Sequence, residues 1–323
     1  MNLRQMIADP KRRAIVLQAL VVLVLVLLVI VIVRNAAVNL ERQNIASGFG
    51  FLNRTAGFDI SQRLIPYKNT DSYARAFWVG LTNTLLVATL GILFATLFGF
   101  LLGFARLSSN WLIAKLALVY VEVVRNVPLL LWLFVLYFGV LLRLPPIDHS
   151  IHLPFGALLN QRGLYLPSLL NGSPTIDHFN ITGGIGIEPE LIALIAGLVT
   201  YTSAYIGEIV RAGIVSVSRG QQQAAVALGL TPSQSLRHVV LPQALRAIIP
   251  PLTNQYVNLA KNSSLAVAVG YPDLVSVFAG TILNHTNQAV ECIAITMAVY
   301  LAISLALSAS MNALNARVAL KER

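Results

Sequence analysis

Long apolar segments, separated by short polar ones, make up most of this chain. Residues 14–33 form an uninterrupted apolar run, and about 20 such residues span the hydrocarbon core of a bilayer as an α-helix. Further apolar segments cover 82–105, 116–142 with a break at Pro128, 191–215, a more polar stretch that begins near 247, and 289–311. The pattern predicts an all-α membrane protein with about six transmembrane helices.

Composition agrees with a membrane protein. Of the 323 residues, 56% are hydrophobic and 11% are charged, and the mean hydropathy is +0.73, outside the range of soluble domains. A net charge of +10 would suggest nucleic acid binding in a soluble chain. In a membrane chain, Lys and Arg instead set the orientation and contact lipid headgroups. We therefore expect the lipid bilayer, and no nucleic acid, as a partner.

Basic residues flank both ends of the apolar region. Lys11 to Arg13 precede the first run, and Arg317, Lys321 and Arg323 follow the last one. Positive flanks stay in the cytoplasm, so the sequence predicts cytoplasmic N- and C-termini. No small-residue cleavage site follows the first run, which we interpret as a retained anchor helix.

Two polar segments are predicted to lie on the opposite, external side. They are residues 34–76 and an insert at 143–190, which contains six prolines and several glycines and is typical of a structured loop or lid. His149 and His152 in the insert are too few ligands for a metal site, so none is expected. The single cysteine, Cys292, excludes an intrachain disulfide.

A polar, basic segment from Arg219 to Pro251 lies between two apolar segments on the cytoplasmic side. Ala224, Ala225 and Leu228 are predicted to share one face of a short helix. Gly229 is expected to end that helix in the left-handed region, and Pro232 suits the first turn of the next helix. The pattern predicts two short helices joined by a sharp bend, presented as a docking surface.

The spacing within this segment has a known counterpart. Gln223-Ala224-Ala225 is followed by three residues, Gly229, nine residues, Val239, one residue and Leu241-Pro242. This resembles the EAA loop of permease subunits of bacterial ABC importers. The match extends to the motifs Pro242-Gln-Ala-Leu-Arg246, Pro250-Pro251, Lys261-Asn-Ser-Ser-Leu265 and Gly270-Tyr-Pro-Asp273. These are similar to the polar amino acid uptake subgroup, and the first span and the insert resemble general L-amino acid permeases.

The resemblance implies a type I ABC importer permease core at 77–315. An anchor helix and external segment at 1–76 precede this core, and a cytoplasmic tail at 316–323 follows it. The chain would lie in the bacterial inner membrane, and its coupling loop, 219–242, would contact an ABC ATPase subunit in the cytoplasm. It also implies a second permease subunit, a periplasmic amino acid-binding protein and alternating access. The expected coupling residues are Gln223, Ala224, Ala225, Leu228, Gly229 and Pro242. Because Gln223 replaces the family's glutamate, no salt bridge to the ATPase is expected there.

The chain has no P-loop motif, and the dipeptide Gly-Lys does not occur in it. It therefore cannot cradle ATP phosphates in the P-loop manner. No nucleophile–base pair is evident either. We expect a transport subunit that is not an enzyme and binds no cofactor, with ATP and Mg²⁺ on the partner ATPase. The alternative is an ion-coupled secondary transporter, which would need inverted repeats and acidic residues at the midplane of the membrane. A receptor or scaffold has no positive signal.

Charged and polar residues within the spans suggest further functional sites. Glu122/Arg125 and Glu208/Arg211 are spaced for pairing on one helix, either as structural neutralisation or as part of an inner gate. The polar positions Asn254, Asn258, Lys261 and Asn262 recur at helical spacing. They predict either a substrate path, in which Lys261 attracts a carboxylate, or hydrogen bonding between subunits. Gly99 and Gly103 would permit close helix approach.

Overall fold

The computed structural model describes residues 10–42, 48–177 and 180–318. Lys321 and Arg323, which contribute to the predicted orientation, lie outside the described residues. The helices are α2 (Pro10–Arg42), α3 (Tyr73–Arg106), α4 (Trp111–Asn126), α5 (Leu129–Phe134), α6 (Pro189–Val215), α7 (Arg219–Ala227), α8 (Pro232–Ser235), α9 (Leu241–Asn262), α10 (Leu283–Thr286) and α11 (Ala289–Val318). Within this range the protein is mostly helical, as the sequence predicts.

Four helices in the described part of the chain are long and apolar enough to cross a membrane: α2, α3, α6 and α11. Helix α4 and the helical segment Leu129–Arg143, which begins with α5, make a fifth if they count as one span, although the chain turns by 105° between them. The turn falls at Val127, which is extended (φ −108°, ψ 131°) because a residue before proline is disfavoured in helical geometry. The predicted break at Pro128 is therefore a sharp bend.

The remaining predicted span is α9, which is not among the helices that satisfy this length and composition criterion. It begins six residues before the predicted start near 247, and prolines 250 and 251 lie inside it. A short π-helical turn, Leu236–Val240, leads directly into it. The predicted count of about six therefore depends on α9, whose polar side chains must be sheltered by protein or water.

Helix α3 also begins earlier than its apolar run suggests. The Ser72 side chain accepts a hydrogen bond from the Arg75 amide at 3.3 Å and caps the helix. The first turns of α3 therefore extend beyond the apolar segment predicted at 82–105. This cap satisfies one of the backbone amides that a helix start leaves unpaired.

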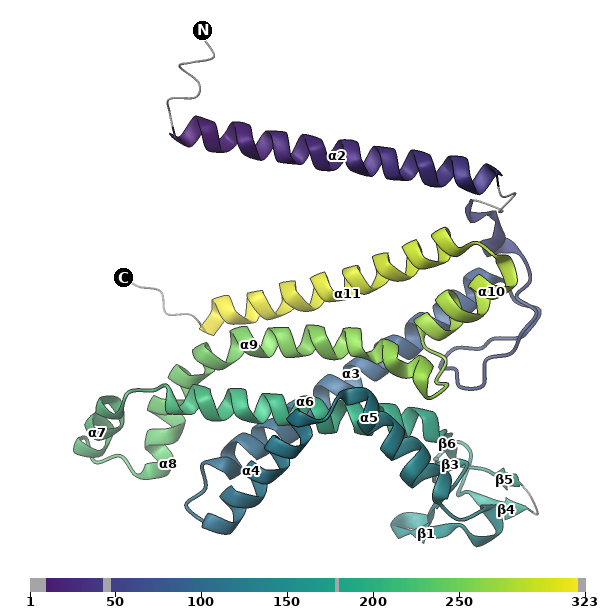
Figure 1. Cartoon of the computed structure of the whole chain (residues 1–323). Helices are drawn as coiled ribbons and strands as arrows, with labels where there is room; N and C mark the ends of the chain where they lie inside the picture. Colours follow the sequence, from purple (N-terminus) through teal and green to yellow (C-terminus); the bar gives the residue numbers. More distant parts are fainter. Residues whose placement is uncertain (1–9, 43–47, 178–179, 319–323) are drawn as a thin grey trace.

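The core of the bundle lies between α3, α6, α9 and α11. Ile206 and Val210 of α6 are buried together with Ile248 of α9 and Met311 of α11. Figure 1 shows these four helices running roughly alongside one another. Gly99 and Gly103 of α3 face α6, where an added Cβ would come within 2.5 Å of Ile206 and 2.6 Å of Val210. The predicted close approach at these glycines is confirmed.

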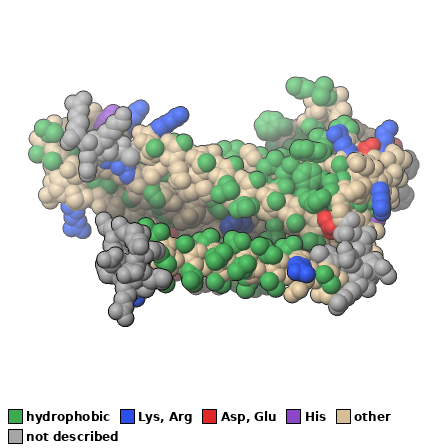
Figure 2. All heavy atoms as spheres, turned by 90° about the horizontal axis from the view of Figure 1, so that it is seen from above, with side chains coloured by type: hydrophobic (Ala, Val, Ile, Leu, Met, Phe, Trp, Pro, Cys, Tyr) green, Lys and Arg blue, Asp and Glu red, His purple; other side chains and the backbone are tan. Residues whose placement is uncertain are grey.

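Helix α2 stands apart from this bundle (Figure 1). None of its apolar span is buried, and Figure 2 shows hydrophobic side chains along its length. A helix that is apolar all round needs an apolar surrounding. The surface of α2 is therefore available to lipid or to another subunit.

The segment that follows α2, which the sequence predicts to be external, belongs to the folded core. Phe51, Ile60 and Tyr67 are buried with Phe278 in one hydrophobic cluster. The Gly48 amide donates to the Glu291 carboxylate at 2.5 Å, which fixes the start of this segment against α11. The predicted boundary near 76 therefore marks a change of hydropathy, while packing continues across it.

The insert at 143–190 contains β-structure that the sequence analysis does not predict. Strands β1 (Ile151–Leu153), β2 (Ala157–Asn160), β3 (Gly163–Leu166) and β6 (Ile185–Ile187) form an antiparallel sheet. Strands β4 (Thr175–Asp177) and β5 (Asn180–Thr182) form a separate hairpin. These three- and four-residue strands are too short to show a clear alternation. The prediction of an all-α membrane protein is confirmed for the bundle, and the predicted structured insert contains these short strands.

The two ends of the bundle differ in structure. Helices α7 and α8 project at one end, where α2 begins and α11 finishes, and the β-structured insert lies at the other end (Figure 1). The Arg246 side chain donates to the Val318 carbonyl at 3.0 Å, joining the start of α9 to the end of α11. At the insert end, the Ser61 hydroxyl donates to the Glu188 carboxylate at 3.2 Å. Burial raises the pKa of Glu188 there.

Candidate functional site

The α7–α8 protrusion has the bent shape that its sequence predicts. Gly229 follows α7 with φ +80°, and its amide donates to the Val226 carbonyl at 2.9 Å. The Leu230 amide donates to the Ala225 carbonyl at 3.1 Å, which completes a C-terminal cap. An added Cβ at 229 would meet nothing within 4 Å. Backbone conformation alone therefore makes glycine favourable at 229.

The second helix of the protrusion is capped from its own sequence. The Thr231 hydroxyl accepts from the Gln234 amide at 3.3 Å, and the Gln234 side chain accepts from the Thr231 amide at 2.9 Å. Pro232 occupies the first turn, as predicted. The reciprocal pair satisfies two amides that the helix start leaves unpaired. Both short helices are therefore fixed at their shared bend.

The apolar surface of the protrusion differs in one respect from the predicted face. Ala225 is buried, whereas Ala224 and Leu228 are exposed, Leu228 by 81%. Ala225 cannot share an outward face with them because α7 packs on the turn at Leu236–Val240. Val226, which is 64% exposed, joins Leu228 instead. The exposed surface available to a partner is thus centred on Val226 and Leu228.

The polar residues that the sequence predicts to take part in coupling lie beside this surface. Gln223 is exposed and lines a shallow cavity with Arg219, Gln222 and Val226. Pro242 is exposed near the start of α9. The Gln243 amide donates to the Gln221 side chain at 3.5 Å, linking α9 to α7. The protrusion is therefore joined to the start of α9 by this contact and by the turn at Leu236–Val240.

The predicted pair Glu208–Arg211 forms on α6. The Arg211 guanidinium donates to the Glu208 carboxylate at 2.6 and 3.0 Å. Arg106 at the end of α3 also donates to Glu208, and the sequence analysis did not assign it this role. Gly99 and Gly103, which bring α3 close to α6, were the sequence signal that could have predicted a contact between Arg106 and Glu208. Glu208 therefore joins two helices through two guanidinium groups.

The prediction that Glu122 and Arg125 pair is wrong, because neither residue is in an ion pair in the described part of the chain, unlike Glu208 and Arg211. The Arg125 side chain turns away from its own helix, and its guanidinium carbon lies 5.0 Å from the ring centre of Tyr205 on α6. Glu122 is exposed. A cation placed over an aromatic face is stabilised there, so contact with α6 replaces pairing along α4.

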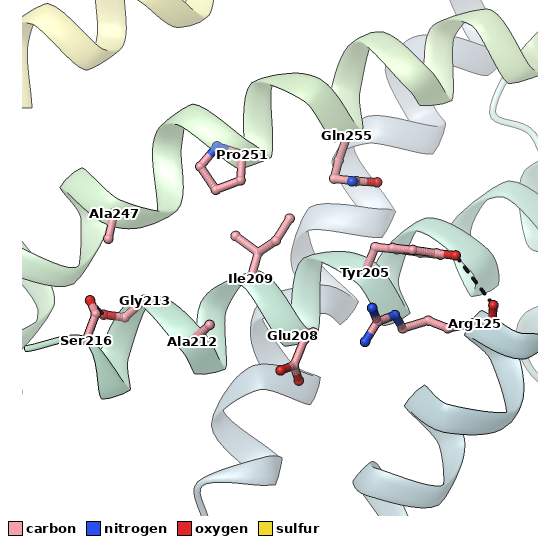
Figure 3. A pocket seen from close by; sticks show the side chains of 10 residues that line it. All are labelled: Arg125, Tyr205, Glu208, Ile209, Ala212, Gly213, Ser216, Ala247, Pro251 and Gln255. Carbon is pink, nitrogen blue, oxygen red and sulfur yellow. Dashed lines mark hydrogen bonds between the residues drawn. The ribbon is translucent and has the colours of Figure 1, made fainter.

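A cavity lies between α6 and α9 beside this cation (Figure 3). Its volume is about 370 Å³. The lining residues are Arg125, Tyr205, Glu208, Ile209, Ala212, Gly213, Ser216, Ala247, Pro251 and Gln255. In Figure 3 the guanidinium of Arg125 lies between Tyr205 and Glu208. Charged and polar groups therefore meet at one side of a mostly apolar space.

The polar positions of α9 lie on one side of the helix. Asn254, Asn258 and Lys261 are exposed and Asn262 is partly exposed, whereas Leu259 is buried. Polar side chains at membrane depth must face protein or water. The structure therefore leaves a polar face on α9 that needs a wet path or a second protein surface.

A buried polar cluster near the insert end was missed by sequence reasoning. The Asp273 carboxylate is fully buried and accepts hydrogen bonds from the Ser276 amide at 2.8 Å and the Tyr300 hydroxyl at 3.1 Å. The Asn83 side chain donates to the Gln62 and Pro272 carbonyls. These contacts tie α3, α11 and the turn after α9 together. The cluster is structural and lies away from the cavity lining.

Comparison with known proteins agrees with this arrangement. Residues 91–320 match the family described as binding-protein-dependent transport system inner membrane component. The chain is 46% identical to General L-amino acid transport system permease protein AapQ of Rhizobium johnstonii, over 100% of this chain and 96% of that protein. It is 44% identical to Putative amino-acid ABC transporter permease protein YhdX of Escherichia coli (strain K12), over 98% of this chain and 96% of that protein. A crystal structure of an amino acid ABC transporter with histidines is similar, with a TM-score of 0.57 at 28% identity, over 76% of this chain and 95% of that chain.

Proposed function

We propose a specific transport role for this chain, which belongs to the family of binding-protein-dependent transport system inner membrane components. The chain is a multi-pass membrane permease subunit, and its relatives are named as amino acid permeases. The proposed role is inward movement of L-amino acids, driven by ATP hydrolysis on a separate chain. The α7–α8 protrusion is the observation that carries the proposal.

The protrusion suits docking to an ATPase on the cytoplasmic side. Val226 and Leu228 expose apolar surface on a polar element, a combination that marks protein interaction sites. The caps at Gly229 and Thr231 hold its shape, so a push on it moves α9 instead of being absorbed by a flexible loop. Because the sequence has no P-loop, ATP and Mg²⁺ would bind the partner ATPase. No cofactor is proposed for this chain.

The orientation follows from the same assignment. If α7 and α8 meet the ATPase, their end of the bundle lies in the cytoplasm. The start of α2 and the end of α11 lie at that end (Figure 1), which supports cytoplasmic termini. The insert and the segment at 48–72 would then lie outside, where a periplasmic amino acid-binding protein would deliver substrate.

The polar face of α9 supports a path shared between two permease subunits. Asn254, Asn258 and Lys261 are exposed in this chain, and a second permease would enclose them away from lipid. That partner is either a second copy or a similar chain. Closure of the ATPase would move α7 and α8, and α9 would switch the path between outward and inward access.

The alternative, an ion-coupled secondary transporter, is not favoured. Two relatives named as amino acid transport permeases cover nearly the whole chain, and α7–α8 provides a surface that ion coupling does not require. Glu208 is neutralised by Arg106 and Arg211 and is therefore poorly suited to carry a coupling proton. ATP-driven import accounts for more of these features.

Reconstitution tests the proposed function. The permease, its ATPase partner and its binding protein would be placed in liposomes, and uptake of a mixture of ¹⁴C-labelled L-amino acids measured. We expect accumulation that requires ATP on the ATPase side. Accumulation driven by a proton or sodium gradient without ATP would contradict the proposal.

A further inference from the structure

The cavity between α6 and α9 is lined by Arg125, a cation without an ion-pair partner among the described residues. Arg125 and Glu208 are the charged residues among those that line it. Glu208 already accepts hydrogen bonds from Arg106 and Arg211, so its charge is matched within the protein. Arg125 forms no ion pair among the described residues and rests on the Tyr205 ring. With Arg106 and Arg211, which lie outside the lining, three guanidinium groups surround one carboxylate, so the charge around the cavity is positive overall.

Tyr205 on α6 contacts both the side chain and the main chain of Arg125. Its guanidinium carbon is 5.0 Å from the Tyr205 ring centre, and the Tyr205 hydroxyl donates to the Arg125 carbonyl at 3.5 Å. The Tyr201 and Tyr205 hydroxyls are 3.1 Å apart, so the ring is itself held. A cation held in this way loses less freedom when it binds an anion. The Arg125 guanidinium thus lies over the Tyr205 ring at the cavity wall.

The cavity continues the polar row of α9. Ala247, Pro251 and Gln255 line it, and steps of three and four residues from Gln255 lead to Asn258 and Asn262. Residues at this spacing lie above one another on a helix face. The same row of α9 thus runs from the cavity toward Lys261. A solute that follows this row toward the protrusion end would meet Arg125.

We propose that this cavity is a carboxylate-binding subsite at the cytoplasmic end of the substrate path, with Arg125 as the cation that binds the α-carboxylate of the amino acid in transit. The inference rests on the proposed function and adds a residue and a ligand group to it. A guanidinium matches the two oxygens of a carboxylate. A cavity of about 370 Å³ is within the range of small-ligand sites. The substrate would bind this subsite after it leaves the polar face of α9 and before it enters the cytoplasm.

The test compares ligands with and without the α-carboxylate. The permease–ATPase complex in phosphatidylcholine nanodiscs, without binding protein, would be given the labelled L-amino acid that the reconstituted system takes up best. Unlabelled amino acid and its α-amide would compete. In the wild type we expect the amide to compete about tenfold more weakly or worse, because it lacks the charge-assisted contact. Equal competition by the two ligands would overturn the proposal without needing any variant.

Variants then assign the contact to Arg125. We expect Arg125→Met to weaken binding of the amino acid by about tenfold or more and to remove the preference over the amide. Arg125→Lys should retain part of the binding of the amino acid and part of the preference over the amide. Lys115→Met, which removes an exposed cation from the same helix outside the cavity, should match the wild type. An Arg125→Met complex that keeps the preference would overturn the subsite.

The outcomes also separate this inference from the proposed function. Failure of the wild type to accumulate any labelled amino acid with ATP would count against the function itself. Normal uptake together with no detectable binding, or with binding unaffected at Arg125, would count against the subsite alone. If an anionic lipid headgroup occupied the cavity instead, exchanging zwitterionic phosphatidylcholine for anionic phosphatidylglycerol would weaken amino acid binding while the amide competed equally. That result would also overturn the proposal.

Discussion

Gly99 on α3 lies directly against Ile206 on α6, so that a Cβ at position 99 would come within 2.5 Å of the Ile206 Cβ. This contact sets the spacing of the two helices that hold Arg106 and Glu208 together. In membranes, where burial of apolar surface favours association less than in water, close approach at small residues provides the packing. The charge cluster at the protrusion end thus depends on glycines one and two turns away.

Gly99→Ala should destabilise the bundle because the new methyl group must displace α6. The expected cost is roughly 1–3 kcal/mol, as for overpacking elsewhere, and it would appear as a lower apparent melting temperature in detergent. Gly139→Ala is the matched control, since the nearest atom to its added Cβ is Val135 Cγ1 at 4.0 Å. Equal melting temperatures for the two variants would contradict the close packing.

Arg211→Gln tests whether the cluster around Glu208 acts as an inner gate. The change leaves Glu208 with Arg106 as its remaining close guanidinium partner. We expect altered uptake and raised basal ATP hydrolysis in the assembled complex, because the contact that holds the closed arrangement is weakened. Unchanged values for both quantities would exclude the gate and leave a structural role.

Lys261→Met tests the polar face of α9 as a substrate path. Lys261 is exposed near the end of the row that contains Asn258, and removal of its charge should lower amino acid uptake several-fold. The amount of assembled complex on size-exclusion chromatography should change little. Lys115→Met again controls for loss of one positive charge. Uptake by Lys261→Met at the wild-type rate would refute the path.

Asp273→Ala should destabilise the insert end of the bundle. The substitution leaves the partly buried Ser276 amide and Tyr300 hydroxyl without their acceptor, and an unsatisfied buried group costs roughly 1–3 kcal/mol. Asp273→Asn keeps one acceptor oxygen and should cost less. Thermal unfolding in detergent measures both variants. If both variants had the same melting temperature as the wild type, the Asp273 carboxylate would have no structural role.

Local chemistry was the most predictable part of the structure. The left-handed Gly229, the first-turn Pro232 and the break at Pro128 each follow from the allowed backbone angles of one or two residues. The long apolar helices follow from the same hydropathy that the membrane requires. These features need no knowledge of what packs against them.

Features that depend on contacts between distant segments could not be predicted in the same way. The spacing of Glu122 and Arg125 permits a pair, but Tyr205, about 80 positions later, offers Arg125 a different contact. Ala225 is buried because α7 folds back on the turn before α9. Neighbouring strands of the insert pair over only three residues, which is too short to show an alternation of apolar and polar residues. In each case tertiary contact decides between options that local spacing leaves open.

The central claim is that α7 and α8 couple this permease to an ATPase, and Gly229→Val tests it most directly. Gly229 and Gly57 have similar backbone angles, φ +80° and +76°, and an added Cβ at either would meet nothing within 4 Å. Valine at either position therefore carries a similar backbone penalty. Only Gly229 lies on the protrusion, while Gly57 lies on the segment at the opposite end.

The measurement is the initial rate of ATP-dependent uptake of labelled L-amino acids by liposomes containing each complex. We predict that Gly57→Val keeps most of the wild-type rate, whereas Gly229→Val loses nearly all of it and retains less ATPase subunit on purification. A Gly229→Val complex that holds its ATPase and transports as fast as Gly57→Val would contradict coupling through α7 and α8.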